Sequence, residues 1–187
     1  MKTIYLLLTR SGTFLSAVIH HLTNAPYTHI SLATTFENGT FGAFYSFGRK
    51  ICRYPLPAGF IQEKLCSGYF GAHPDTQCTL IALPVSDEAH ALICERLQDM
   101  ADSEKTYHYN LLGVILCYWG ISLRRQHHFF CSQFVADILD ESGAVQLPKP
   151  SSLMHPIDYT ALDQAQFLFT GCVGDLLTNA EALPICP

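Results

Sequence analysis

The chain has 187 residues, of which 49% are hydrophobic and 14% charged, a balance that is typical of a folded protein and argues against a disordered one. Sixteen acidic residues outnumber 11 lysines and arginines, which gives a formal net charge of -5, and no basic run could follow a phosphate backbone. We therefore expect a single domain over residues 1–187 and no nucleic-acid partner.

The sequence also carries no clear signal for export, membrane insertion or metal binding. Residues 1–21 begin like a signal peptide, but Arg10 interrupts the apolar run and no small-residue cleavage pattern follows. The longest apolar stretch, 110–123, is shorter than the roughly 20 residues of a membrane-spanning helix, so we expect a buried helix. Eight irregularly spaced cysteines without CxxC or HExxH motifs predict reduced thiols, no metal and no cofactor in a cytoplasmic protein.

The first part of the chain predicts mainly β-structure. Residues 2–10 are rich in strand formers and residues 13–23 place apolar side chains at helical spacing, so we expect a strand followed by a helix. The β-prone runs 27–36 and 40–50 flank Asn38-Gly39, which is a strong signal for a β-hairpin.

The middle of the chain predicts a loop, a strand and a helix. Residues 48–75 are rich in proline, glycine and cysteine, which indicates a long loop with short structured pieces, and residues 77–85 then predict a strand. Ser86 is placed to cap a helix that has acidic residues in its first turn. The apolar face expected for this helix comprises Ala89, Leu92, Ile93, Leu97 and Met100.

A further amphipathic helix is expected to begin at Cys131 and to end at Gly143, with a last strand within 165–173. An isolated cysteine is most often a buried, inert side chain. Cys131 differs because it lies in the first helical turn, where unpaired N–H groups and the helix dipole stabilise a thiolate and can bind an oxyanion. A catalytic thiolate would also need a histidine that exchanges a proton with the leaving group.

Among the nine histidines, His29 has the most suitable context for that role. It lies within a β-prone run, where an isolated histidine is most often a satisfied core side chain. His127 and His128 belong to a basic turn before the cysteine helix. The remaining histidines are expected at a helix end, in loops or on polar faces: His20, His21, His73, His90, His108 and His155.

Four segments occur in an order that has a known counterpart: YTHISLA (27–33), YSFGRK (45–50), AGFIQE (58–63) and FFCSQFVADIL (129–139). This pattern, over roughly residues 3–158, resembles the permuted papain-like cysteine hydrolases of the NlpC-type superfamily, in which the histidine strand precedes the cysteine helix. The resemblance implies an α+β, papain-like fold whose antiparallel sheet packs against the cysteine-bearing helix. It also implies that Cys131 is the nucleophile and that His29 is its base.

The residue that would orient the imidazole has two candidates. Related enzymes place a polar residue on the next strand, and a hairpin centred on Asn38 would set His29 opposite about Phe47, which makes Ser46 the nearest polar side chain. Glu63 is the second candidate, because a carboxylate would both fix the tautomer and stabilise the imidazolium. Taken singly, a strand serine is ordinarily bonded to backbone and a loop glutamate is ordinarily solvated.

The resemblance implies thiol-dependent hydrolysis of an amide, isopeptide or related acyl bond in a peptide, amide or lipid-amide substrate. Peptidoglycan-type peptides are disfavoured because no export signal is evident, so we expect an intracellular substrate. Two alternatives stay open. One is a lipid acyltransferase or thioesterase with the same Cys-His pair, resembling lecithin retinol acyltransferase, which the many aromatic residues and the apolar stretch 110–123 would suit. The other is a non-catalytic binding module that retains the fold.

Overall fold

The structure, a computed structural model, describes residues 1–10, 25–50, 57–103 and 106–183. Its main feature is a six-stranded sheet in which every neighbouring pair is antiparallel, in the order β10-β7-β1-β2-β5-β6. The strands are β1 (Lys2–Arg10), β2 (His29–Ala33), β5 (Phe44–Arg49), β6 (Ala58–Glu63), β7 (Gln77–Val85) and β10 (Gln166–Cys172). An α+β fold with an antiparallel sheet is thus confirmed, while the helix predicted at 13–23 lies outside the described residues.

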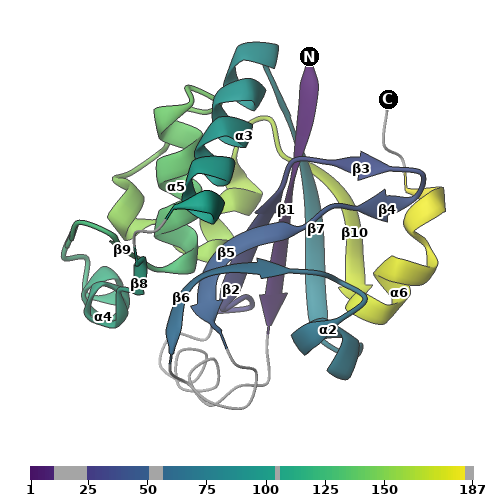
Figure 1. The fold of residues 1–187 in the computed structure, drawn as a ribbon, viewed down its shortest axis with the longest axis horizontal. Helices are drawn as coiled ribbons and strands as arrows, with labels where there is room; N and C mark the ends of the chain where they lie inside the picture. Colours follow the sequence, from purple (N-terminus) through teal and green to yellow (C-terminus); the bar gives the residue numbers. More distant parts are fainter. Residues whose placement is uncertain (11–24, 51–56, 104–105, 184–187) are drawn as a thin grey trace.

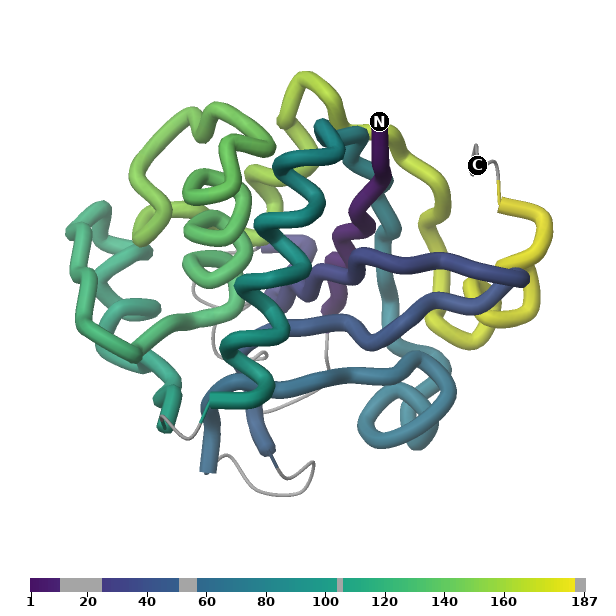
Figure 2. Tube along the Cα trace, turned by 45° about the horizontal axis from the view of Figure 1, so that its top comes forward, coloured from purple at the N-terminus to yellow at the C-terminus, as the bar shows by residue number. Residues whose placement is uncertain are grey.

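Helices and a short hairpin cover both faces of this sheet (Figures 1 and 2). One face carries α3 (Asp87–Asp102) and α5 (Cys131–Glu141). The other face carries α2 (Gly68–Ala72), α6 (Val173–Thr178) and the hairpin of β3 (Phe36–Glu37) and β4 (Thr40–Phe41). The remaining elements are α4 (Leu111–Tyr118), β8 (His108–Tyr109), β9 (His128–Phe129) and the 3-10 helices η1 (Ser151–Leu153), η2 (Pro156–Ala161) and η3 (Ala180–Ala182).

Burial on both faces explains the unbroken apolar run of β1. Successive side chains of a strand point to opposite faces of the sheet. Leu6 and Leu8 accordingly lie in the core under α3 and α5, whereas Tyr5 and Leu7 lie in the core under α2 and α6. A strand covered on one face alone would show alternating polar residues, so this run indicates a central strand.

Helix α5 is anchored in the larger core, against β2 and β5. Val135 and Leu139 have no exposed surface, and Phe134 is 1% exposed. Burying each side chain of this size stabilises the fold by about 1.5–3 kcal/mol relative to leaving it in water. The helix that begins at Cys131 is therefore fixed against the strand that begins at His29.

Several local predictions are confirmed. The Ser86 side chain accepts a hydrogen bond from the Ala89 N–H at the start of α3. Asn38 and Gly39 form the turn between β3 and β4 with φ of 51° and 73°, and Gly143 follows α5 with φ of 67°. Strands also form where they were predicted at 2–10, 77–85 and, one residue shorter at each end, at 165–173.

The described part of residues 48–75 contains short structured pieces, as predicted: β6 at 58–63, which pairs with β5 along its full length, and α2 at 68–72. Two other predictions about elements are wrong. Leu92 is 50% exposed, so it does not belong to the apolar face of α3. The apolar stretch 110–123 forms a helix only over Leu111–Tyr118, and much of that helix is exposed rather than buried. Among the described residues, no helix combines the length and the apolarity needed to cross a bilayer.

The turn at Asn38-Gly39 shifts the predicted pairing by one residue. A two-residue turn sets the axis of the hairpin between its two residues, so that Leu32 pairs with Tyr45. Continued along β2, this register would set His29 opposite Gly48, whereas an axis through Asn38 would set it opposite about Phe47. A Cβ at Gly48 would lie 3.7 Å from Cε1 of His29 and 2.7 Å from Cδ1 of Ile61, so the absence of a side chain keeps space beside the imidazole.

Candidate active site

Cys131 is the first residue of α5 and is 6% exposed. Phe130 precedes it with extended backbone, and no side chain caps the first turn of the helix. The buried Tyr159 hydroxyl donates a hydrogen bond to the Ser132 carbonyl, which holds this turn in place. The N–H groups of an uncapped first turn have no partner within the helix, so they are available to an anion near the thiol.

His29 and Glu63 form an ion pair beside Cys131. The Nε2 atom of His29 donates to Oε2 of Glu63 at 3.0 Å, and the two side chains are only 16% and 15% exposed. The imidazole also forms a hydrogen bond with the Cys131 side chain. Because Nε2 is engaged by Glu63, Nδ1 is the nitrogen left for the thiol. The structure thus brings together three of the four residues singled out from the sequence.

The surroundings of His29 favour its protonated form. Burial alone would lower the pKa of His29, but the Glu63 charge, hydrogen bonds of the imidazole to Cys131 and Glu63, and the Cys131 charge raise it to about 10. Near neutral pH the imidazole is therefore cationic. The imidazolium therefore places a positive charge beside the Cys131 side chain.

Ser46 is the fourth predicted residue, and it does not join this group. It has no exposed surface, and its hydroxyl donates to the Ile30 carbonyl at 2.6 Å. This bond satisfies the serine within the sheet. Of the two residues that the sequence offered as partners of His29, Glu63 is the one that bonds the imidazole.

Ser46→Ala should distinguish a structural serine from a member of the site. We expect the free energy of unfolding to fall by about 1–3 kcal/mol, because the buried Ile30 carbonyl loses its donor. The alkylation rate of Cys131 should stay unchanged, since the pair of His29 and Glu63 is untouched. Denaturant unfolding and peptide mass spectrometry measure the two effects. A severalfold loss of Cys131 reactivity in the folded variant would return Ser46 to the site.

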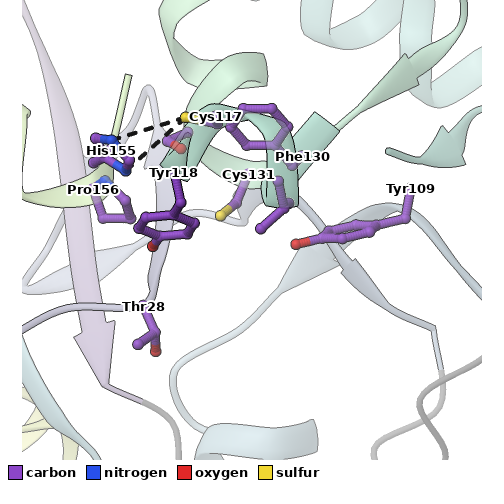
Figure 3. Close-up of a pocket in the computed structure, with 10 residues that line it drawn as sticks. Thr28, Tyr109, Cys117, Tyr118, Phe130, Cys131, His155 and Pro156 are labelled. Carbon is purple, nitrogen blue, oxygen red and sulfur yellow. Dashed lines mark hydrogen bonds between the residues drawn. The ribbon is translucent and has the colours of Figure 1, made fainter. Parts of the chain in front are cut away.

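A pocket that is open to solvent lies at the thiol (Figure 3). The rings of Tyr109 and Tyr118 lie on opposite sides of Cys131, and Thr28 lies below it in this view. Burial first, then charges on Cys131 and Tyr118, raise the pKa of Tyr109 well above its usual value. Its hydroxyl therefore stays protonated near neutral pH and is available as a donor in the pocket.

The same pocket contains a second Cys-His pair with different electrostatics. The Cys117 sulfur lies 3.9 Å from Nε2 and 4.0 Å from Nδ1 of His155. Burial raises the pKa of Cys117 to about 11, and burial followed by the Lys149 charge lowers the pKa of His155. Both groups are therefore neutral near pH 7, in contrast to the cationic His29. Figure 3 shows this pair beside Cys131, which makes it an internal control for reactivity.

A carboxylate on the imidazole distinguishes His29 from the other histidines that lie near a thiol. His90 also contacts a cysteine, with 3.6 Å between its Nδ1 atom and the Cys94 sulfur, but its Nε2 atom bonds the Thr34 carbonyl. Among the described residues, only His29 has both a thiol and a carboxylate bonded to its ring. This combination makes Cys131 the thiol with an adjacent, ionised proton donor.

Sequence reasoning missed the pocket residues Tyr109, Cys117, Tyr118 and His155. They come from β8, from α4 and from the segment before η2, and no spacing within the sequence links these elements. His155 was expected at the surface, whereas it packs on the Tyr118 ring with 4.7 Å between ring centroids. In the ranges that the structure describes, no group of three or more histidine, cysteine or acidic side chains could hold a metal ion.

Comparison with protein-family models, with curated proteins and with solved structures found no match to this chain. The chemistry of the site is therefore inferred from its own geometry and electrostatics.

Proposed function

We propose that this protein is a thiol-dependent hydrolase that cleaves an amide or a related acyl bond. Cys131 is the nucleophile, His29 carries the proton, and Glu63 orients and charges the imidazole. The observation that carries the proposal is the 3.0 Å hydrogen bond that the His29 imidazole donates to Glu63, while the same ring also bonds the Cys131 side chain. This class of covalent catalysis uses a nucleophile, a proton carrier in contact with it, and a carboxylate that orients the carrier.

We further propose a permuted papain-like arrangement. Two features support it: the histidine strand precedes the cysteine helix in the chain, and α5 packs against β2 with its first residue at the imidazole. Glu63 lies at the end of β6, the edge strand of the sheet, where its carboxylate reaches His29 across the sheet.

In the first half of the reaction, the Cys131 thiolate attacks the substrate carbonyl carbon, and the carbonyl electrons move to oxygen. The uncapped N–H groups of the first turn of α5, with the Tyr109 hydroxyl, are suited to stabilise this oxyanion. The tetrahedral intermediate then collapses and breaks the bond to the leaving group. The leaving group takes a proton from His29, and the acyl group remains on Cys131 as a thioester.

In the second half, water attacks the thioester carbonyl and gives a proton to the now neutral His29. The second tetrahedral intermediate breaks the carbon–sulfur bond, which releases a carboxylic acid and restores the thiolate. Glu63 stabilises the imidazolium at both ends of the cycle without being protonated itself. The reaction therefore balances with substrate and water alone.

An acyltransferase is the second candidate. It differs only in that a lipid hydroxyl or amine, rather than water, attacks the thioester. The exposed apolar side of α4, next to the pocket that contains Cys131, is the observation that favours it. Adding a lipid acceptor during turnover distinguishes the two: formation of acylated acceptor faster than free acid supports transfer.

Alkylation of Cys131 by iodoacetamide tests the proposed ion pair without knowledge of the substrate. At about pH 6.5, where an ordinary thiol is largely protonated, we expect Cys131 to react at least tenfold faster than Cys117 in the same pocket. His29→Ala should slow the alkylation of Cys131 about tenfold or more, because the neighbouring cation is lost. Peptide mass spectrometry after timed quenching measures each thiol separately.

The exposed Cys66 is the reference for the intrinsic reactivity of the reagent, and it should react equally in both proteins. Comparing Cys131 with itself in the two proteins removes the effect of its burial. If His29→Ala leaves the rate at Cys131 unchanged in a folded protein, the imidazole does not activate the thiol. In that case a non-catalytic binding module becomes the better interpretation.

A further inference from the structure

Helix α4 presents an exposed apolar surface beside the pocket. Five large apolar side chains of α4 and the residues after it are each about half exposed or more. We call these residues the α4 face: Leu111 (50% exposed), Leu112 (51%), Ile115 (46%), Trp119 (73%) and Ile121 (50%). Among the described residues, only four other large apolar side chains are exposed, and they lie apart from one another in the chain: Met1, Leu92, Phe167 and Leu177. Clustered exposed apolar side chains of this kind mark an interaction surface, whereas scattered ones need no explanation.

The segment around the α4 face is basic in a chain that is acidic as a whole. No aspartate or glutamate occurs between Glu104 and Asp137, although the net charge of the chain is -5. Arg124 and Arg125 follow the face, and both are exposed. Arg124 bonds Asp137 at 3.1 Å but remains 62% exposed. Three histidines flank the arginines on β8 and β9 and in the turn before β9: His108, His127 and His128.

The helix that carries the α4 face also borders the site. The opposite side of the same helix supplies Val114, Cys117 and Tyr118 to the pocket that contains Cys131. Figure 1 shows α4 at one end of the molecule, next to β8 and β9 and away from the centre of the sheet. A surface on which α4 rests would therefore be separated from the pocket by this one helix.

We propose that the α4 face binds the protein to the surface of an anionic lipid bilayer, so that acyl groups of lipids are the substrates that reach the pocket. Apolar and tryptophan side chains enter the interfacial region of a bilayer, while neighbouring arginines contact anionic headgroups. The positive charge of this segment favours an anionic bilayer over a second copy of the chain as the partner of the α4 face, because a second copy would bring the same positive charge against it. Membrane binding through the α4 face does not depend on catalysis. The substrate class that it implies, a lipid amide or ester, rests on the proposed hydrolase function.

The tryptophan of the face provides a direct measurement, because Trp119 is the only tryptophan in the chain. The full chain carrying Cys131→Ala is titrated with vesicles of phosphatidylcholine containing about one-third phosphatidylglycerol. We expect the Trp119 emission to shift to shorter wavelength and to be quenched by lipids brominated on their acyl chains. Vesicles of phosphatidylcholine alone should bind severalfold more weakly. An emission spectrum that the anionic vesicles leave unchanged would overturn the proposal.

Matched variants locate the surface. Leu112→Ser with Ile115→Ser should weaken the apparent Kd about tenfold or more, whereas Leu92→Ser, which removes an equally exposed leucine from α3, should leave it unchanged. Arg125→Gln should weaken binding about fivefold and reduce its salt dependence. Equal binding by all variants would overturn the proposal, as would a spectral shift that depends on protein concentration without vesicles, which would assign the face to self-association.

The experiments test the membrane-binding proposal and the hydrolase proposal separately. If vesicle binding is as described but Cys131 shows no His29-dependent alkylation, the hydrolase proposal fails and the membrane-binding proposal stands. If alkylation is as described but vesicles do not bind, the membrane-binding proposal fails and the hydrolase proposal stands.

Discussion

Replacing Cys131 with alanine should lower kcat/KM for hydrolysis of a p-nitrophenyl acyl ester by at least about a thousandfold. Alanine has no nucleophile, so no thioester forms and only binding and oxyanion stabilisation remain. Absorbance of the released p-nitrophenolate measures turnover. Intact-protein mass spectrometry of acid-quenched samples measures the acyl-enzyme, which should form on the parent chain and be absent from the variant.

Cys117→Ala is the matched control for this substitution. Both thiols line the same pocket, and their exposures, 4% for Cys117 and 6% for Cys131, are similar. The Cys117 variant should retain turnover within severalfold, because His155 does not ionise its thiol. Thermal unfolding of both variants shows whether they fold. Retained turnover in Cys131→Ala, or an acyl group found on Cys117, would contradict the assignment of the nucleophile.

The contrast between the two Cys-His pairs shows why proximity alone does not define a catalytic site. Cys117 and His155 lie within contact distance in the pocket, yet burial favours the neutral form of both. Burial opposes the charge on His29 as well, but the Glu63 carboxylate and the Cys131 side chain together outweigh it. Glu63 makes the largest of these opposing contributions, so the acid on the far side of the imidazole distinguishes the two pairs.

Elements determined by neighbouring residues were predictable from the sequence. The Ser86 cap of α3, the turn at Asn38-Gly39 and the start of α5 at Cys131 each depend on residues within a few positions of one another. Local hydrogen bonds and helical periodicity suffice to specify such features. The positions of His29 on a strand and of Cys131 at a helix start were predicted on this basis.

Features determined by distant partners were not predictable in the same way. The apolar stretch 110–123 indicates burial, but its exposure depends on which elements pack against α4. The six residues of β6 contain a glycine and end in polar residues, and their pairing with β5 makes them a strand. The choice between Ser46 and Glu63 depended on that pairing and on a register that the turn shifts by one residue. A carboxylate 34 positions from its histidine leaves no local signal.

Replacing Glu63 with glutamine should lower kcat/KM about a hundredfold to ten-thousandfold and make activity more sensitive to alkaline pH. Activity requires a protonated His29, so it is lost as pH rises through the pKa of that residue, which is about 10 in the parent chain. Glutamine keeps the size of the side chain but removes the charge that raises this pKa. The alkaline limb of the profile of kcat/KM against pH should therefore move to lower pH in the variant. NMR titration of the His29 ring nitrogens measures the same shift without substrate.

The exposed Glu95 on α3 offers the control for this substitution, because Glu95→Gln removes the same charge far from the imidazole and should leave both the profile and the titration unchanged. A variant that was merely less stable would lose activity at all pH values without moving the His29 titration. If Glu63→Gln loses activity while His29 titrates as in the parent chain, the carboxylate holds the edge strand and does not charge the imidazole. The thiolate at Cys131 would then lack the cation on which its reactivity depends, and the mechanism would have to begin from a neutral pair, with His29 taking the proton from the thiol as it attacks.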